Sequence, residues 1–233
     1  MSKNSIIFAQ NLGMFSQSEE NYLKAIYRLE LDLNESIINT NLIAEKLETK
    51  ASSVTDMLKK LAQKDLVNYQ KYKGVSVTKK GKSIALSIVR KHRLWEFFMV
   101  EKLNFKWDEV HDVAEQLEHI KSEELVNRLD AFLDFPTHDP HGDPIPDKDG
   151  KVSLRHTLVL SNIPLKTICK VVGVKDSSNS FLKYLEKLKI SLGSIITIIN
   201  KEEFDNSLII EINNIEINIS NQIANNLIIA KIN

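Results

Sequence analysis

The chain has 233 residues, of which 42% are hydrophobic, and it carries 31 basic and 31 acidic side chains. This length and composition are typical of a globular protein with two or three modest domains. No apolar run approaches the roughly 18 to 20 residues needed to cross a bilayer, and the polar start MSKNS lacks a signal-peptide layout, so we expect a cytoplasmic protein without a membrane partner. The single cysteine, Cys169, excludes an internal disulfide and a CxxC zinc site.

The charges are distributed unevenly along the sequence. Residues 1–95 have a net charge of +7, residues 96–146 of −9, and the remainder of +2. A basic region followed by an acidic one indicates a polyanion as the partner of the first and cations as ligands of the second. Chance clustering on two solvated surfaces is the alternative.

The first third of the chain predicts a winged helix-turn-helix. Apolar residues at helical spacing predict a helix over residues 18–31, with Ser18 as its N-cap. A short helix follows from Thr40 or Asn41, the segment ETKAS interrupts it, and SSVTDMLKKLAQKD predicts a second helix. The runs LVNYQ and VSVT flank the turn KYKG, which predicts a β-hairpin.

The rest of the chain predicts helices and then a sheet. We expect amphipathic helices over residues 79–103, 107–120 and 122–135, which end at a stretch with four prolines and two glycines over residues 134–150. From about Pro164, the runs KVVGV, SIITIIN, SLIIEI, IEINI and LIIAKI predict a small barrel of about five strands, like an SH3 domain, with one helix in NSFLKYLEKL. The expected fold class is α+β.

The segment HDVAEQLEH has the side chains of a metal site. His111, Glu115, Glu118 and His119 stand at i, i+4, i+7 and i+8, which is one face of a helix. Two carboxylates brought to roughly 4 Å repel each other by about 4 kcal/mol at an effective dielectric of about 20, so their convergence requires a counter-charge such as a divalent cation. His92 and Glu96 repeat this chemistry one helix earlier. Solvated side chains on an amphipathic helix are the alternative.

The second helix of a helix-turn-helix enters the major groove with its N-terminal residues. Small polar side chains there would face base edges or phosphates, and the lysines around them and on the wing would contact the phosphate backbone. The residues expected to contact DNA are Thr40, Lys50, Ser52, Ser53, Thr55, Asp56, Lys59, Lys60, Lys71 and Lys73.

Five motifs together resemble the diphtheria toxin repressor family of iron- or manganese-dependent bacterial repressors. They are SEENYLKAIYRLE, IAEKLETKASSVTDMLKKLAQKDLVNYQKYKGVSVTKKG, RKHRLWE, VHDVAEQLEHI and DPHGDPIP, in this order and spacing. The resemblance is strong over residues 18–146 and weaker beyond, where longer members have an SH3-like module. It implies an N-terminal arm (1–17), a winged helix-turn-helix DNA-binding domain (18–80), a helical dimerisation and metal-binding domain (81–146), a linker (147–163) and an SH3-like, FeoA-like β domain (164–233).

The resemblance also implies two metal sites. The primary site matches Asn21, Glu115, Glu118 and His119, and the second site matches His92, Glu96 and His111. Asn21 stands where the family usually has Met or Asp, so it binds through its amide oxygen or not at all. Lys24 stands where some manganese-responsive members have a second carboxylate, which makes a closely bridged pair of manganese ions unexpected.

Ligand type leaves the metal open, because imidazole and carboxylate together suit Mn, Fe, Co, Ni or Zn. Glu115 replaces the cysteine of iron-responsive members, and a hard carboxylate favours manganese. Asp176 matches loosely an additional ligand of longer members. His138 and His141 are interpreted as parts of a structural loop, because proline and glycine fix turns there.

The combined prediction is a homodimeric, metal-dependent repressor that binds double-stranded DNA at a palindromic operator and controls metal-ion homeostasis. We expect Mn²⁺ or Fe²⁺ as its cofactor, with Zn²⁺, Co²⁺ or Ni²⁺ able to substitute in vitro, and no small-molecule substrate. One alternative is a winged-helix DNA-binding protein with a purely structural metal site. Another is a metal-dependent hydrolase, but the chain has no HExxH motif, nucleophile elbow or P-loop, so we expect no enzyme.

Overall fold

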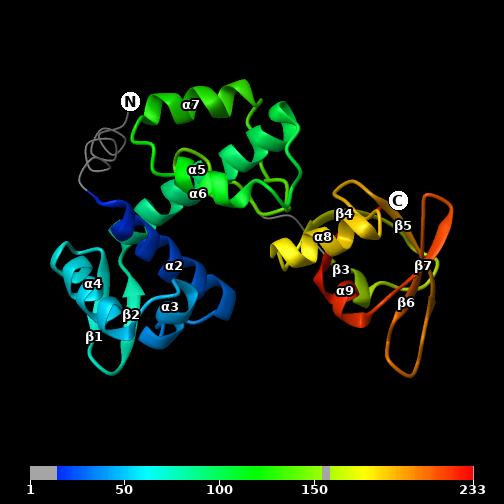
Figure 1. The fold of residues 1–233 in the computed structure, drawn as a ribbon, viewed down its shortest axis with the longest axis horizontal. Helices are drawn as coiled ribbons and strands as arrows, with labels where there is room; N and C mark the ends of the chain where they lie inside the picture. Colours follow the sequence, from blue (N-terminus) through cyan, green and yellow to red (C-terminus); the bar gives the residue numbers. More distant parts are fainter. Residues whose placement is uncertain (1–14, 154–157, 233) are drawn as a thin grey trace. The chain divides into compact units, whose positions relative to one another are not determined.

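The structure is a computed structural model that describes residues 15–153 and 158–232, so residues 1–14 of the expected N-terminal arm lie outside it (Figure 1). The chain divides into two compact units. Among described residues, the first unit contains 15–92, 115–134 and 146–151, and the second contains 93–114, 135–145, 152–153 and 158–232. No helix in the described ranges has the length and apolar character needed to cross a membrane.

The first unit begins with a winged helix-turn-helix, as predicted (Figure 1). Its elements are α2 (Gln17–Leu33), α3 (Thr40–Lys46), α4 (Ala51–Gln63), β1 (Val67–Gln70) and β2 (Gly74–Val77). The two strands form an antiparallel hairpin with Val67 opposite Val77. The apolar faces of the helices meet in a core that includes Leu23, Ile26, Ile43, Val54 and Leu58, all fully buried.

The first helix begins earlier than its predicted N-cap, Ser18. Ser16 is the N-cap, and its side chain accepts a hydrogen bond from the backbone N–H of Glu19, while the Glu19 carboxylate accepts one from the backbone N–H of Ser16. This reciprocal capping box satisfies two backbone donors, whereas a lone Ser18 cap would satisfy one, so the prediction of Ser18 is wrong.

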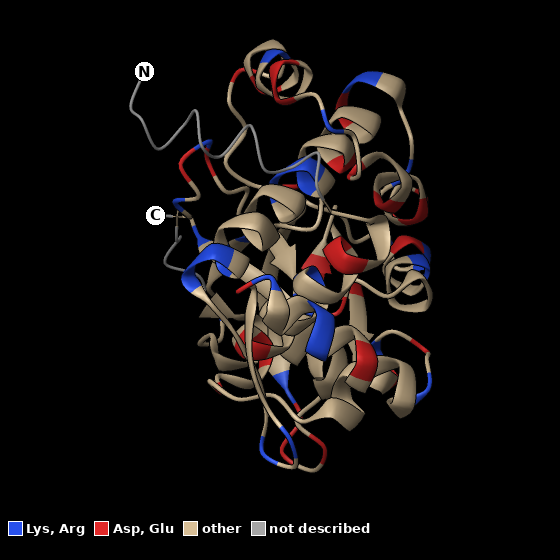
Figure 2. Ribbon diagram, turned by 90° about the vertical axis from the view of Figure 1, so that its left-hand side faces the viewer, with Lys and Arg blue, Asp and Glu red and all other residues tan. Residues whose placement is uncertain are grey.

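The long helix α5 spans Lys79–Leu103, which confirms the predicted range. The boundary between the net positive region (residues 1–95) and the net negative region (residues 96–146) falls inside this helix. Figure 2 shows that the helices carry basic as well as acidic residues. Helix α6 is shorter than predicted, because it spans only His111–Leu117. Glu118 and His119 lie in the turn that follows, so the expected single helical face does not contain all four predicted ligands.

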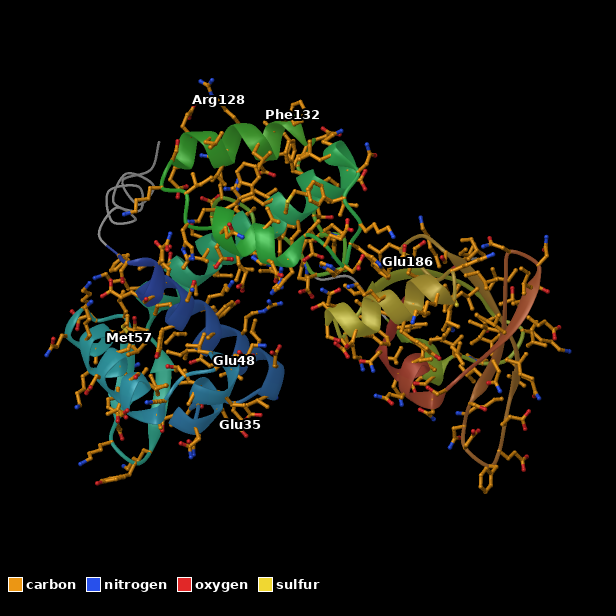
Figure 3. The ribbon with its side chains drawn as sticks, viewed as in Figure 1. Glu35, Glu48, Met57, Arg128, Phe132 and Glu186 are labelled. Atoms are coloured by element: carbon orange, nitrogen blue, oxygen red, sulfur yellow. The ribbon has the colours of Figure 1, made fainter. Side chains whose placement is uncertain are left out.

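The turn after α6 leads directly into α7 (Glu123–Phe132), whose N-cap is Ser122. In the interior, Arg90 of α5 donates hydrogen bonds to Asn127 and Asp130 of α7. On the outer side, Arg128 and Phe132 extend away from α7 (Figure 3), and Phe132 is 65% exposed.

The second unit contains a six-stranded antiparallel sheet in the order β3-β8-β4-β5-β6-β7. The strands are β3 (Leu158–Val159), β4 (Ile168–Val174), β5 (Ile195–Lys201), β6 (Leu208–Ile212), β7 (Ile215–Ile219) and β8 (Leu227–Lys231). Alternating residues such as Cys169, Val171, Ile196, Ile198, Ile210 and Ile229 are fully buried and form its core with α8 (Asn179–Lys187). The five predicted runs all form strands.

Three short elements of this sheet domain have no counterpart in the prediction, and one of them is the 3-10 helix η2 (Leu160–Asn162). Strand β3 has two residues, which is too short for a visible period, and α9 spans the polar segment Asn221–Asn226. Helix α9 forms because Ser220 caps it through the N–H of Ile223, while Ile223 and Ala224 are buried.

Candidate metal centres and DNA-binding surface

Lys24 of α2 lies between two carboxylates from the end of α6. Its Nζ is 3.2 Å from Oε1 of Glu115, 2.7 Å from Oε1 of Glu118 and 2.8 Å from Oε2 of Glu118. Oε2 of Glu118 is also 2.6 Å from Nδ1 of His92 on α5. We call Lys24, His92, Glu115 and Glu118 the Lys24 cluster. Its centre is shielded from bulk solvent, because the side chain of Glu118 is fully buried and that of Lys24 is 11% exposed.

Glu118 is held in its charged form. Burial raises its pKa, but the hydrogen bond with His92 and the charge of Lys24 outweigh this effect and lower the pKa below its usual value. The ammonium group of Lys24 therefore acts as the counter-ion of a buried carboxylate, a position that a metal ion bound to the same oxygens would take.

The other two predicted primary ligands, Asn21 and His119, have different surroundings. Nδ1 of His119 is 2.6 Å from Oε2 of Glu20, and its Nε2 is 3.9 Å from Oε1 of Glu118. Oδ1 of Asn21 is buried and has no hydrogen-bond partner among the described residues. A buried acceptor without a donor costs free energy, and coordination of a cation would satisfy it.

A second group of ligand-type side chains surrounds Glu96 of α5. Its Oε1 is 3.3 Å from Nδ1 of His111, and its Oε2 is 3.7 Å from Nδ1 of His141. One ligand atom each of Glu96, Asp139 and His141 lies within 4.8 Å of the others, and all three residues are buried. We call Glu96, His111, Asp139 and His141 the His141 cluster.

The charges of the His141 cluster shift the pKa values of its members. Burial and the neighbouring charge of Glu96 raise the pKa of Asp139. Burial lowers the pKa of His141, but the hydrogen bond with Glu96 and the charges of Glu96 and Asp139 outweigh it and raise the pKa to about 9. Nε2 of His141 donates to the backbone carbonyl of Trp107 over 2.8 Å. His141 is thus an imidazolium between carboxylates, and Arg93 lies 3.6 Å from Asp139.

The loop that presents Asp139 and His141 is fixed by its backbone. Oδ1 of Asp139 accepts hydrogen bonds from the N–H groups of His141 and Asp143. The carbonyl of His141 accepts from the N–H of Val174 in β4. Gly142 has φ of +88°, and a Cβ there would lie 2.3 Å from the carbonyl oxygen of Val172, so only glycine fits.

Most of the predicted DNA-contacting residues of α4 lie at its start, and Lys59 and Lys60 lie in its second half. Ser52, Ser53 and Lys50 are exposed, while the Thr55 hydroxyl donates to the carbonyl of Ala51 in the preceding turn. Three charged residues of the predicted set have ion-pair partners within the protein. Lys59 forms an exposed ion pair with Asp56 over 3.1 Å, and Lys60 lies 3.2 Å from the buried carboxylate of Glu19. Thr40 is partly buried as the first residue of α3.

The wing presents an aromatic residue that the sequence analysis missed. Lys71 and Lys73 are exposed in the turn between β1 and β2, and Tyr72 between them is 94% exposed. Nζ of Lys71 lies 4.8 Å from the centre of the Tyr72 ring. An exposed aromatic ring between two lysines was visible in the sequence as KYK, and it could have marked the tip of the wing as a contact surface.

Three family models match consecutive parts of the chain. "Iron dependent repressor, N-terminal DNA binding domain" matches residues 14–75, "Iron dependent repressor, metal binding and dimerisation domain" matches residues 78–147, and the FeoA domain matches residues 158–231. A solved structure of a manganese-dependent transcriptional repressor in complex with manganese is 33% identical, with a TM-score of 0.78, and the likeness covers 92% of this chain and 100% of that one. This chain belongs to the iron-dependent repressor family.

Other members of the iron-dependent repressor family are similar over different lengths. The structure of ScaR with bound Cd²⁺ is 32% identical, covers 92% of this chain and 99% of its own, and has a TM-score of 0.73. The iron-dependent repressor IdeR of Mycobacterium leprae is 35% identical over 128 residues, which are 54% of each chain. The match to IdeR thus spans about half of the length of that relative. The matching models describe repressor domains and not an enzyme.

For an iron-dependent repressor, both clusters offer donors that fit a divalent first-row metal, namely carboxylates and imidazoles. The two clusters differ in the charge that already lies between their carboxylates. The His141 cluster places two buried carboxylates side by side, whereas the Lys24 cluster already holds a cation between its carboxylates. Among the predicted ligands, Glu96 contacts His111, and Glu115 and Glu118 are bridged by Lys24. His92 lies one turn before Glu96 on α5 and contacts Glu118.

The sequence analysis of this family member missed three residues near the candidate ligands. Asp139 was not considered, and His141 was interpreted as part of a structural loop, although both lie within ligand distance of Glu96. Glu20 also escaped attention. The signal was the close pairing of an aspartate and a histidine in DPH. The interpretation as part of a structural loop suits the neighbouring His138, whose Nδ1 lies 2.9 Å from the hydroxyl of Thr137. Asp176 is exposed and accepts a hydrogen bond from the N–H of Ser178.

Proposed function

We propose that this chain is a metal-dependent, homodimeric, DNA-binding transcriptional repressor that controls metal-ion homeostasis. One observation carries the proposal. Helix α2, the first helix of the winged helix-turn-helix, contributes Glu20 and Lys24 to contacts with Glu115, Glu118 and His119 at the end of α6. A change of cation at this point therefore acts directly on a helix of the DNA-binding domain.

The residues that would hold metal are of two groups. We propose Asn21, Glu115, Glu118 and His119 as the primary set and His92, Glu96 and His111 as the second set. We add Asp139 and His141 to the second set, and their proximity to Glu96 supports this addition. A bound divalent ion would supply the positive charge that lets buried carboxylates and the donors of α2 converge. The orphaned Oδ1 of Asn21 supports its inclusion, since an amide oxygen is a suitable ligand for a hard cation.

We infer Mn²⁺ as the preferred metal, with Fe²⁺ as the second choice and Zn²⁺, Co²⁺ or Ni²⁺ as substitutes in vitro. The support is the donor set, which is made of hard carboxylates and borderline imidazoles without a thiolate. The one cysteine, Cys169, is fully buried in the sheet domain, and burial raises its pKa to about 11. The similar manganese-dependent repressor points in the same direction.

The DNA partner is inferred to be a duplex with a palindromic operator, because a two-fold symmetric dimer presents two recognition helices to two half-sites. We propose α4 as the recognition helix and the lysines of the wing as phosphate contacts. Exposed apolar side chains on α7, including Leu125 (43%) and Phe132 (65%), lie within the range matched by the dimerisation model and support a homodimer.

The test is a metal titration of DNA binding. Duplexes are selected from a random library in two parallel pools, one with Mn²⁺ and one with chelator, and the affinity of each product is measured by gel shift in both conditions and with Fe²⁺ under anaerobic conditions. We expect a palindrome only from the Mn²⁺ pool, bound about a hundredfold more tightly with metal than without. Equal affinity with and without metal would contradict metal activation and favour a winged-helix protein with a structural metal site.

A further inference from the structure

We propose that Lys24 is a tethered cation that competes with the metal for Glu115 and Glu118, and so sets the metal concentration at which the chain responds. This inference rests on the proposed function of the same site. It starts from the position of the ammonium group, whose Nζ lies within 3.2 Å of three carboxylate oxygens of these two residues.

The oxygens that Lys24 contacts are those that a divalent ion would need. An ion bound to these oxygens, at metal–oxygen distances of about 2.0–2.2 Å, would share them with the ammonium group of Lys24, which has the same sign of charge and would repel it. Burial makes this repulsion strong, because Glu118 is fully buried and Lys24 is 11% exposed. An ammonium group has no lone pair to share with the ion, so Lys24 must move out when the ion binds.

Lys24 also explains how the cluster stays folded without metal. Glu118 brings a buried negative charge that is compensated by Lys24 and by the hydrogen bond with His92. An uncompensated buried carboxylate is strongly destabilising. The same ammonium that stabilises the metal-free chain is then an energetic cost that the metal has to overcome, which weakens the response to ions that bind poorly.

The chain offers a matched control for Lys24. Nζ of Lys64 lies 2.6 Å from Oε1 of Glu19, another buried carboxylate of α2, in the same unit. A Lys64→Met variant therefore removes the same charge from the partner of another buried carboxylate of α2, although Lys64, the C-cap of α4, is itself 34% exposed. Its partner Glu19 belongs to neither ligand cluster. Lys24→Met keeps an unbranched side chain that is one atom shorter and has no charge, and Lys24→Gln is the second variant if the methionine variant does not fold.

The first measurement is direct binding of Mn²⁺ without DNA, by electron paramagnetic resonance of free Mn²⁺ and by calorimetry. We expect Lys24→Met to bind Mn²⁺ about tenfold to a hundredfold more tightly than the unmodified chain, as displacement of a charge-assisted hydrogen bond implies. The gain should vanish in the double variant Lys24→Met/Glu118→Gln, and Lys64→Met should bind like the unmodified chain. An affinity of Lys24→Met that equals or falls below that of the unmodified chain overturns the proposal.

The second measurement uses the unmodified chain. Lysines are acetylated under limiting conditions with and without saturating Mn²⁺, and the modification of each lysine is followed by peptide mass spectrometry. We expect modification of Lys24 to rise several-fold with Mn²⁺ while that of Lys64 stays constant, and an unchanged Lys24 overturns the proposal. The proposed function is judged separately, because its failure appears as metal-independent DNA binding of the unmodified chain, which neither Mn²⁺ affinity nor acetylation measures.

Discussion

The Lys24 cluster and the His141 cluster solve the same electrostatic problem with different cations. Each gathers carboxylates, at least one of them buried, around a positive charge from the protein, an ammonium group in the first and an imidazolium in the second. The lysine can give way to a metal only by moving, whereas the histidine can lose its proton and become a ligand itself. A protonated histidine can therefore stay in place when a metal binds, whereas a lysine competes with the metal for the same carboxylates.

The two clusters also differ in what holds them. The Lys24 cluster is built from helices and the turn after α6, while the His141 cluster depends on a loop whose backbone is tied to β4 through Gly142 and the carbonyl of His141. Predictions that disturb one cluster and spare the other can test this division, and they are given below from the largest expected effect to the smallest.

Gly142→Ala should damage the His141 cluster most. The new Cβ would lie 2.3 Å from the carbonyl oxygen of Val172 and 2.4 Å from Cα of Gly173, at a φ of +88°. We expect a loss of roughly 3 kcal/mol or more in the free energy of unfolding, because backbone must move, together with loss of Mn²⁺ at this cluster. Urea unfolding and calorimetry measure both.

The matched control for this substitution is Gly150→Ala. Gly150 also has a positive φ of +76°, but the new Cβ would meet only the flexible side chain of Leu86 at 3.3 Å. We expect a loss of about 1 kcal/mol and unchanged Mn²⁺ binding. Equal losses in the two variants would show that backbone contact with β4 does not hold the His141 loop.

Glu118→Gln should have the largest effect on the Lys24 cluster. The substitution removes the buried charge that Lys24 and His92 contact, so we expect Mn²⁺ affinity at this cluster to fall on the order of a hundredfold. Glu115→Gln should cost only about tenfold, because the Glu115 side chain is 50% exposed. Calorimetry that finds equal effects for both would refute the dominant role given to the buried carboxylate.

His141→Ala should weaken Mn²⁺ binding at the His141 cluster about tenfold, because it removes one imidazole from a set that retains Glu96, Asp139 and His111. The neighbouring His138→Ala is its control, since His138 contacts Thr137. The ratio of bound Mn²⁺ to protein at a fixed low metal concentration distinguishes them. A loss that is the same in both variants would assign the effect to the loop and not to the ligand.

Lys64→Met should have the smallest effect, and one that depends on pH. Burial raises the pKa of Glu19, but hydrogen bonds from Lys64, the Ser16 backbone and Lys60 outweigh it and lower the pKa from 4.5 to about 2. A lowered pKa means that these contacts stabilise the fold above about pH 4.5 and that this contribution is lost as the pH falls through about 2. We expect a loss of about 1 kcal/mol at pH 7 that shrinks towards pH 2, measured by thermal unfolding in chelator.

Much of the fold could be predicted from local sequence patterns. The helical period of residues 79–103 predicted α5 with its correct ends, and the KYKG turn predicted the hairpin of the wing. Errors occurred where two local signals compete. Ser16 and Ser18 both offer a cap, and only the reciprocal bond with Glu19 selects the first. The run from residue 107 to 120 keeps an apolar period, but the chain turns at both ends of α6.

The candidate ligands could be listed from the sequence, because carboxylates and imidazoles at helical spacing stand out within a short segment. Their partners could not, because contacts across the chain depend on packing. Lys24 lies 91 and 94 residues from Glu115 and Glu118, so its role as their counter-ion becomes visible only when α2 packs beside the end of α6. The sequence by itself determined the family, the elements and the ligand types, since these follow from short-range patterns. Only the tertiary structure decided that a lysine fills one cluster and that His141 completes the other, because burial and distance determine which charges meet.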